Sequence, residues 1–253
     1  MTAAAQITYV GHATVLVEID GVRLLTDPVL RRRVGPLWRH GALPDPHLAE
    51  DVDAVLISHL HHDHADLPSL RRLNRTVPVL AAPGAGDFLA QLGFGDVREL
   101  APGNSGTVGG VRITATEANH PAGGRRFERA SRPVGFELNG QRRIYFAGDT
   151  DLFVGMETIG GGKLDLALLP IWGWGTNIGA GHLNPERAAW AAALLSAKLV
   201  VPIHWGTLYP FGLARLRPEP LRAPPRELAT WMRKLAPQAE LRVLAPGEAT
   251  SLA

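Results

Sequence analysis

The stretch that decides the fold is Ala54-Val55-Leu56-Ile57-Ser58-His59-Leu60-His61-His62-Asp63-His64. Its first four residues form a short apolar run of the kind that makes a buried strand. Four of the ten histidines of the chain follow directly. In an extended chain His59 and His61 point to the same side and can bind one metal ion, while Asp63 and His64 can offer a carboxylate and an imidazole to a second. The stretch therefore predicts a metal site at the end of a buried strand.

Two ions need more ligands than this cluster supplies. The chain has no cysteine, so the ligands must come from His, Asp or Glu, and these suit zinc, manganese or iron. Three candidates each lie just past a stretch with a strand-like pattern: His120, Asp149 and His204. A carboxylate has two oxygens, so Asp149 can bridge two ions. For any one of the three taken alone, the alternative is that it is a loop residue that only makes hydrogen bonds.

The spacing His59-x-His61-x-Asp63-His64, followed by His120, Asp149 and His204, resembles the ligand set of the metallo-β-lactamase superfamily. The resemblance implies that His59, His61 and His120 hold one metal ion and that Asp63, His64 and His204 hold the other, with Asp149 shared. It also implies an α/β fold of four layers, an αββα sandwich, with residues 1–253 as one domain. The expected cofactors are two divalent metal ions, zinc first, with manganese or iron as alternatives.

Further motifs narrow the resemblance. Gly11-His12-Ala13-Thr14, Asp27-Pro28 and Gly181-His182-Leu183-Asn184-Pro185-Glu186 resemble the branch that contains ascorbate-6-phosphate lactonases and N-acyl-phosphatidylethanolamine-hydrolysing phospholipases D. Oxygen- or nitric-oxide-reducing diiron members carry Glu where His61 stands, so the chain resembles the hydrolytic members. No long insertion separates Asp149 from His204, which argues against the nucleases that carry an inserted cap domain there. The length of the chain also leaves no obvious room for an extra helical domain of the glyoxalase II kind.

We expect a metal-dependent hydrolase in which a metal-bridging hydroxide cleaves a small ester, lactone or phosphodiester. Asp63 and Asp149 could orient the nucleophile as well as bind metal. His182 lies just before a predicted helix and is assigned to substrate contact or general acid catalysis, with orientation of its loop as the alternative. His12 is expected to hold a metal-binding carboxylate. His62 alternates away from its neighbours and is expected to take no part.

Substrate contacts are expected from the loops. Arg125 and Arg126, with Arg129, Arg132 and the arginines at 31–33 and 39, could form a basic rim that favours an anionic, phosphate-bearing substrate. Solvated loop charge is the alternative for any one of them. Trp172 could form a wall of the pocket, and Trp205 is as compatible with core packing. Residues 29–51 show no clear pattern, which favours a functional loop or lid.

The remaining pattern alternates strands and helices. Strands are predicted at Ile7–Val10, Thr14–Ile19, Val22–Thr26, Val77–Ala81, Val111–Glu117, Val134–Leu138, Arg143–Ala147, Leu164–Leu169, Lys198–Pro202 and Leu241–Leu244. Helices are predicted at Leu67–Leu73, Gly86–Leu92, Glu186–Ser196 and Pro224–Leu235. Asn184-Pro185 is typical of a helix start, with a capping side chain followed by proline at the first helical position.

Composition limits the partners. The 253 residues carry a formal charge of only +2, which gives little support to a nuclease, the main alternative function, so no nucleic acid is expected. No stretch is apolar enough to span a membrane, and the N-terminus does not resemble a signal peptide, so a cytoplasmic enzyme for a small molecule is expected. β-Lactam hydrolysis is disfavoured for the same reason. A non-catalytic metal sensor and a homo-oligomer both stay open.

Overall fold

Two seven-stranded sheets form the centre of the molecule, which a computed structural model describes at residues 5–121, 130–173 and 179–252. One sheet runs β17 (Ala249–Leu252), β1 (Ala5–Gly11), β2 (Thr14–Ile19), β3 (Val22–Thr26), β6 (Ala54–Ile57), β7 (Val79–Ala81) and β8 (Val97–Glu99). The other runs β16 (Glu240–Leu241), β14 (Leu199–Ile203), β13 (Leu166–Pro170), β12 (Arg143–Phe146), β11 (Val134–Asn139), β10 (Val111–Glu117) and β9 (Ser105–Val108).

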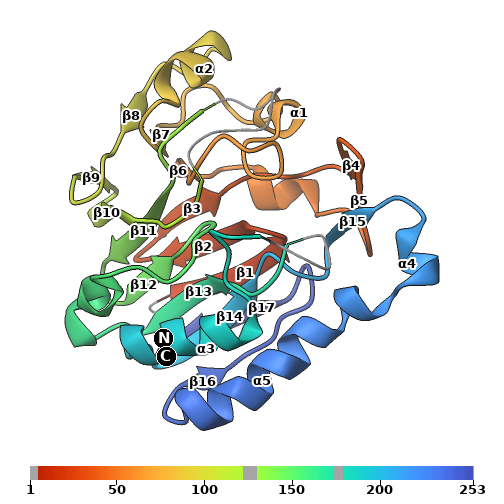
Figure 1. Cartoon of the computed structure of the whole chain (residues 1–253). Helices are drawn as coiled ribbons and strands as arrows, with labels where there is room; N and C mark the ends of the chain where they lie inside the picture. The colour runs from red at the N-terminus through yellow and green to blue at the C-terminus, as the bar shows by residue number, and fades with distance from the viewer. Residues whose placement is uncertain (1–4, 122–129, 174–178, 253) are drawn as a thin grey trace.

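Helices cover the outer face of each sheet (Figure 1). The first sheet carries α1 (Leu67–Leu70) and α2 (Gly86–Gln91), and the second carries α3 (Pro185–Leu195), α5 (Ala223–Leu235) and the 3₁₀ segment η2 (Met156–Gly162). The inner faces pack on each other through a core that includes Ile7, Val17, Phe136 and Phe146, all at most 1% exposed. The order helix, sheet, sheet, helix is the αββα sandwich expected from the sequence.

Strand direction brings the predicted ligands to one edge. In the first sheet β3 and β6 are parallel, and β1 shares their direction because β2 is antiparallel to both β1 and β3. In the second sheet β12, β13 and β14 are parallel, and β10 shares their direction because β11 lies antiparallel to both β10 and β12. Loops after the carboxyl ends of each set therefore meet at the same edge of their sheet.

A third, small sheet occupies residues expected to be a loop or lid. It runs β15 (Leu208–Pro210), β5 (Leu37–Arg39) and β4 (Arg33–Val34), and the 3₁₀ helix η1 (Pro46–Ala49) follows it. Val34, Leu37 and Leu208 pack with Val29 beneath this sheet. The expectation of a loop-like stretch at 29–51 was therefore wrong for β4, β5 and η1, because β5 completes its hydrogen bonds with β15, a segment far along the chain.

The predicted elements otherwise differ mainly at their ends. Thr14–Ile19, Val22–Thr26 and Val111–Glu117 are strands with the predicted bounds, whereas the helix predicted at Leu67–Leu73 has a single α-helical turn. The last predicted strand, Leu241–Leu244, is wrong in its bounds, since pairing with β14 ends at Leu241. The chain also contains α4 (Leu213–Leu216) and η3 (Glu219–Leu221). Among the described residues, every helix is too short or too polar to cross a bilayer.

Candidate metal centre

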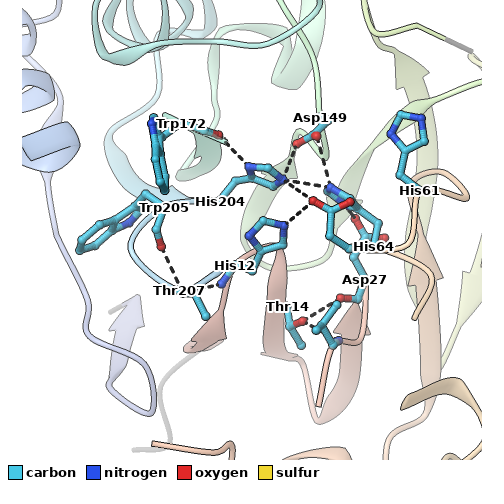
Figure 2. A network of polar contacts seen from close by, with 12 residues as sticks. His12, Thr14, Asp27, His61, His64, Asp149, Trp172, His204, Trp205 and Thr207 are labelled. Atoms are coloured by element: carbon cyan, nitrogen blue, oxygen red, sulfur yellow. Dashed lines mark hydrogen bonds and ion pairs between the residues drawn. The ribbon is translucent and has the colours of Figure 1, made fainter. Parts of the chain in front are cut away.

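Seven side chains predicted as metal ligands meet where the loops after four strands converge. His59, His61, Asp63 and His64 follow β6, and His120, Asp149 and His204 follow β10, β12 and β14. Figure 2 shows Asp149, His64 and His204 directed toward one another from different segments. His59, His64 and His204 are almost completely buried, each at most 1% exposed. The fold thus brings together residues separated by up to 145 positions, from 59 to 204.

The first group contains three imidazoles. His59 Nε2 lies 2.9 Å from His61 Nδ1, and His120 Nε2 lies 3.1 Å from the same His61 atom. Potential ligand atoms of all three lie within 4.8 Å of one another. This is the set assigned to the first ion by the resemblance.

The second group combines imidazoles and carboxylates. His64 Nε2 lies 3.1 Å from His204 Nε2, and His204 Nε2 lies 3.6 Å from Asp63 Oδ2. Asp149 Oδ2 lies 3.2 Å from His64 Nε2, while Asp149 Oδ1 lies 3.3 Å from His204 Nε2. Asp149 also groups with His120 of the first set, so it lies between the two groups.

The outer nitrogens of four imidazoles already have partners. His64 Nδ1 faces Asp27 Oδ2 at 2.8 Å, and His204 Nδ1 faces the carbonyl of Trp172 at 2.7 Å. The carbonyl of Gly181 lies 2.8 Å from His120 Nδ1, and Ser58 Oγ lies 3.0 Å from His59 Nδ1. Carboxylate and carbonyl oxygens only accept hydrogen bonds, and the Ser58 hydroxyl already donates its proton to Asp27, so all four partners place a proton on Nδ1. In the neutral rings the Nε2 atoms, which face the cluster, then carry lone pairs.

These lone pairs provide the test of whether a metal fits. Two unprotonated nitrogens cannot share a hydrogen bond, yet His64 Nε2 and His204 Nε2 lie 3.1 Å apart. Tetrahedral ligands about 2.0–2.1 Å from one zinc ion lie about 3.3–3.4 Å from each other. Asp149 Oδ1 is buried without a hydrogen-bond donor among the described groups. Converging lone pairs at this spacing suit a divalent cation.

The electrostatics of the cluster favour added positive charge. Burial disfavours the charged forms of Asp63 and Asp149, but hydrogen bonds and charge from the surrounding histidines hold the pKa of both carboxyls well below the usual range. Burial also opposes protonation of His64, yet the charge of Asp149 raises the pKa of His64 well above its ordinary value. Burial lowers the pKa of His120 to about 4. The carboxylates thus demand cations, which imidazolium supplies without metal and divalent ions supply when bound.

Other residues hold the ligands in place. His12 Nε2 lies 3.0 Å from Asp63 Oδ2, the arrangement expected for it. Tyr9 Oη and Thr207 Oγ1 each accept a hydrogen bond from the backbone N–H of His12 at 3.0 Å. His12, Asp27 and His204 adopt positive φ angles of 60°, 33° and 58°, a conformation that costs energy in residues other than glycine and collects at functional sites.

Asp27 is the residue that the sequence analysis left without a role. It is completely buried and receives hydrogen bonds from the N–H and Oγ of Ser58, at 2.8 and 2.5 Å, as well as facing His64. The signal in the sequence was an acidic residue at the end of a strand, Asp27-Pro28, in the same position as the predicted ligands of the other strands.

The remaining predicted residues are placed as follows. His182 Nε2 lies 3.6 Å from Asp149 Oδ2, the His182 ring lies 4.6 Å from that of His120, and the side chain is 23% exposed. Trp172 is 8% exposed and touches the site through its carbonyl. His62 is exposed, as expected. Arg125, Arg126 and Arg129 lie outside the described residues.

Three arginines of the expected basic rim have other partners. Arg31 is paired with Asp66 at 2.6 Å, and Arg132 with Glu117 at 2.7 Å. Arg39 is only 3% exposed, and its guanidinium donates to backbone carbonyls that include Val29 at 2.5 Å. Arg31, Arg39 and Arg132 were expected to contribute to a basic rim around the pocket. Each instead already has a carboxylate or carbonyl partner within the chain.

Comparison with known proteins agrees with this geometry. A family model described as a beta-lactamase superfamily domain matches residues 22–205. The chain belongs to the metallo-β-lactamase superfamily. A metal-dependent hydrolase of Rubrobacter xylanophilus is 33% identical over 98% of this chain and 97% of its own length. This relative, which matches nearly the whole chain, is described as a metal-dependent hydrolase.

The chain is also similar to a named phospholipase, to an uncharacterized protein and to a solved structure. N-acyl-phosphatidylethanolamine-hydrolyzing phospholipase D 1 of Caenorhabditis elegans is 33% identical over 84% of this chain and 67% of that protein. An uncharacterized protein of Mycobacterium bovis is 34% identical over 88% of this chain, but the match spans only 62% of its length. The structure of Igni18, a metallo hydrolase from Ignicoccus hospitalis, has a TM-score of 0.74 with 28% identity and 98% coverage of both chains.

Proposed function

We propose that the chain hydrolyses a small anionic ester, lactone or phosphodiester at a dinuclear metal centre. The observation that carries the proposal is the convergence of the Nε2 atoms of His59, His64, His120 and His204 on one space beside Asp63 and Asp149, while their Nδ1 atoms face other partners. His59, His61 and His120 would hold one ion, Asp63, His64 and His204 the other, and Asp149 both. Zinc is the first expectation, with manganese or iron as alternatives.

Two bound divalent ions would make hydroxide available near neutral pH and polarise the bond to be cleaved. The residues of the chain would do the rest. Asp63, fixed by its contact with His12, can accept a hydrogen bond from the attacking water and hold it in line. Asp149 can do the same, because it lies between both groups of histidines.

His182 is the best-placed group to meet a substrate. Its side chain is partly exposed while its neighbours in the cluster are buried, and its Nε2 lies 3.6 Å from Asp149 Oδ2. From this position it can donate a hydrogen bond to a substrate oxygen or a proton to a leaving group. Such a contact favours substrates that carry negative charge, which agrees with phosphodiester chemistry in the Caenorhabditis elegans relative.

Metal analysis and a turnover screen test the proposal together. Protein purified without chelator should contain two metal equivalents, and a screen of phosphodiesters, lactones and oligonucleotides with varied metals should find a small-molecule substrate. Asp63→Ala should abolish turnover, whereas Asp96→Ala, which removes an exposed carboxylate paired with Arg98, should leave it intact. Turnover of oligonucleotides alone would instead support a nuclease, and metal without turnover of any substrate would favour a sensor.

A further inference from the structure

A cavity lies apart from the predicted metal ligands, between the small sheet and the segment that follows β15. Its volume is about 450 Å³, within the range of about 300–1,000 Å³ that small-molecule sites occupy. His40, just after β5, lines the cavity together with Ala214, Pro218 and Leu221. In Figure 1 this region is the right-hand side of the molecule, near α4 and β15.

The charge of the cavity is positive and uncompensated. Arg222 lines it, and none of the described lining residues is acidic. The nearest carboxylate along the chain, Glu219, is engaged by Arg226 at 2.7 Å. Within the described part of the chain the guanidinium of Arg222 has no ion pair. An arginine left unpaired beside a cavity is a ready partner for a phosphate or carboxylate.

Polar groups beside the cavity are also unsatisfied. His40 Nε2 and Tyr209 Oη are both buried without a hydrogen-bond partner among the described groups. The His40 and Tyr209 rings lie 6.2 Å apart in an edge-on arrangement. Buried polar atoms without partners are costly, and a ligand oxygen, or a water that accompanies it, would satisfy them. The rest of the lining is small and apolar, which suits a short carbon skeleton.

We propose that this cavity binds a small organic anion, a phosphate or a carboxylate, through Arg222 and His40. Part of the cavity lining is close in sequence to the predicted metal ligand His204. Gly206, which lines it, lies between His204 and Thr207, and the backbone N–H of His40 donates to the carbonyl of Thr207 at 2.7 Å. Thr207 Oγ1 in turn holds the backbone of His12. An occupant therefore contacts the segment that positions both His204 and His12.

Inorganic phosphate is the probe for a first experiment on the full metal-loaded chain. Phosphate can also bind at the metal ions, so the readout must be local to the cavity. Nitrogen NMR of histidine-labelled protein supplies it, with the His40 signals assigned by their disappearance in His40→Gln. We expect the His40 ring signals to shift on titration and to saturate.

Two matched variants decide between a site and general attraction. Arg222→Gln should weaken the phosphate dependence of the His40 signals at least tenfold, and Arg222→Lys should restore part of it. Arg233→Gln removes the same charge about three helical turns further along α5, outside the cavity, and should leave the titration unchanged. Both positions are exposed, and equal thermal midpoints would establish that the variants fold.

The proposal fails if phosphate binds while the His40 signals stay fixed, because binding would then lie elsewhere. It also fails if Arg233→Gln weakens the titration as much as Arg222→Gln does. Neither outcome touches the hydrolase proposal, which depends on metal content and turnover.

Discussion

Asp27 Oδ2 lies 2.8 Å from His64 Nδ1, and neither side chain is exposed. This pair joins the end of β3 to the predicted metal-binding stretch after β6. It fixes the orientation of the His64 ring and leaves Nε2 directed at His204 and Asp149. A carboxylate behind a metal-binding imidazole both orients the ring and increases its basicity.

Asp27→Asn should weaken metal binding about 10–100-fold, the usual effect of removing such a partner. All three groups that face Asp27, the Ser58 N–H, the Ser58 hydroxyl and His64 Nδ1, donate to it. An asparagine has only one acceptor oxygen and must turn its NH₂ toward one of these donors. Competition with a chromophoric chelator measures the loss. Asp96→Asn, an exposed carboxylate, is the control, and equal affinities in both variants would contradict the role given to Asp27.

Removal of metal should lower thermal stability and its return should restore it. A ligand that binds only the folded chain stabilises by about 2.7 kcal/mol at a hundred times its dissociation constant. For a chain of this size that corresponds to a fall of roughly 5–10 °C in the unfolding midpoint. The measurement is thermal unfolding with EDTA, with metal-saturated EDTA as the control. An unchanged midpoint would contradict preferential binding of metal to the folded chain.

Asn184→Ala should destabilise the fold by about 1 kcal/mol. The Asn184 side chain accepts a hydrogen bond from the backbone N–H of Arg187 at 2.9 Å, and Pro185 occupies the first turn of α3. The cap also anchors the loop that carries His182. Urea unfolding measures the change, and Asn184→Ser, which keeps a capping oxygen, should recover most of it. Equal losses in both variants would mean that the side chain acts through another contact.

Some parts of this site can be predicted from the sequence more directly than others. The spacing within 59–64 is local, and β6 ends where the apolar run ends, so both can be predicted from neighbouring residues. His120, Asp149 and His204 could be predicted because each follows an apolar or alternating stretch. Their convergence agrees with the prediction, while their assignment as ligands stays a prediction until metal is measured.

The parts that were missed depend on contacts between distant segments. β4 and β5 have two and three residues, too few for a periodic pattern, and β5 pairs with β15, which follows far along the chain. Arg39 resembles a loop cation in the sequence, yet this pairing buries it against carbonyls. Asp27 acquires its role from Ser58 and His64, more than 30 positions later.

Stability at acid pH should depend on Asp165, which joins three strands of the second sheet. Burial disfavours its charged form, but the N–H of Arg143 and the ammonium of Lys198, both 2.9 Å away, lower the pKa of Asp165 below its ordinary value of 3.8. A carboxyl whose pKa is lower in the folded chain stabilises the fold above its unfolded pKa, and this stabilisation disappears as pH falls through the folded pKa. We therefore expect wild type to lose stability below about pH 4 more steeply than Asp165→Asn, which has no proton to gain there. Lys198→Met keeps the carboxyl but removes one partner and should lie between them. Urea unfolding between pH 3 and 6 measures the slopes, and parallel slopes for wild type and Asp165→Asn would contradict this account of Asp165.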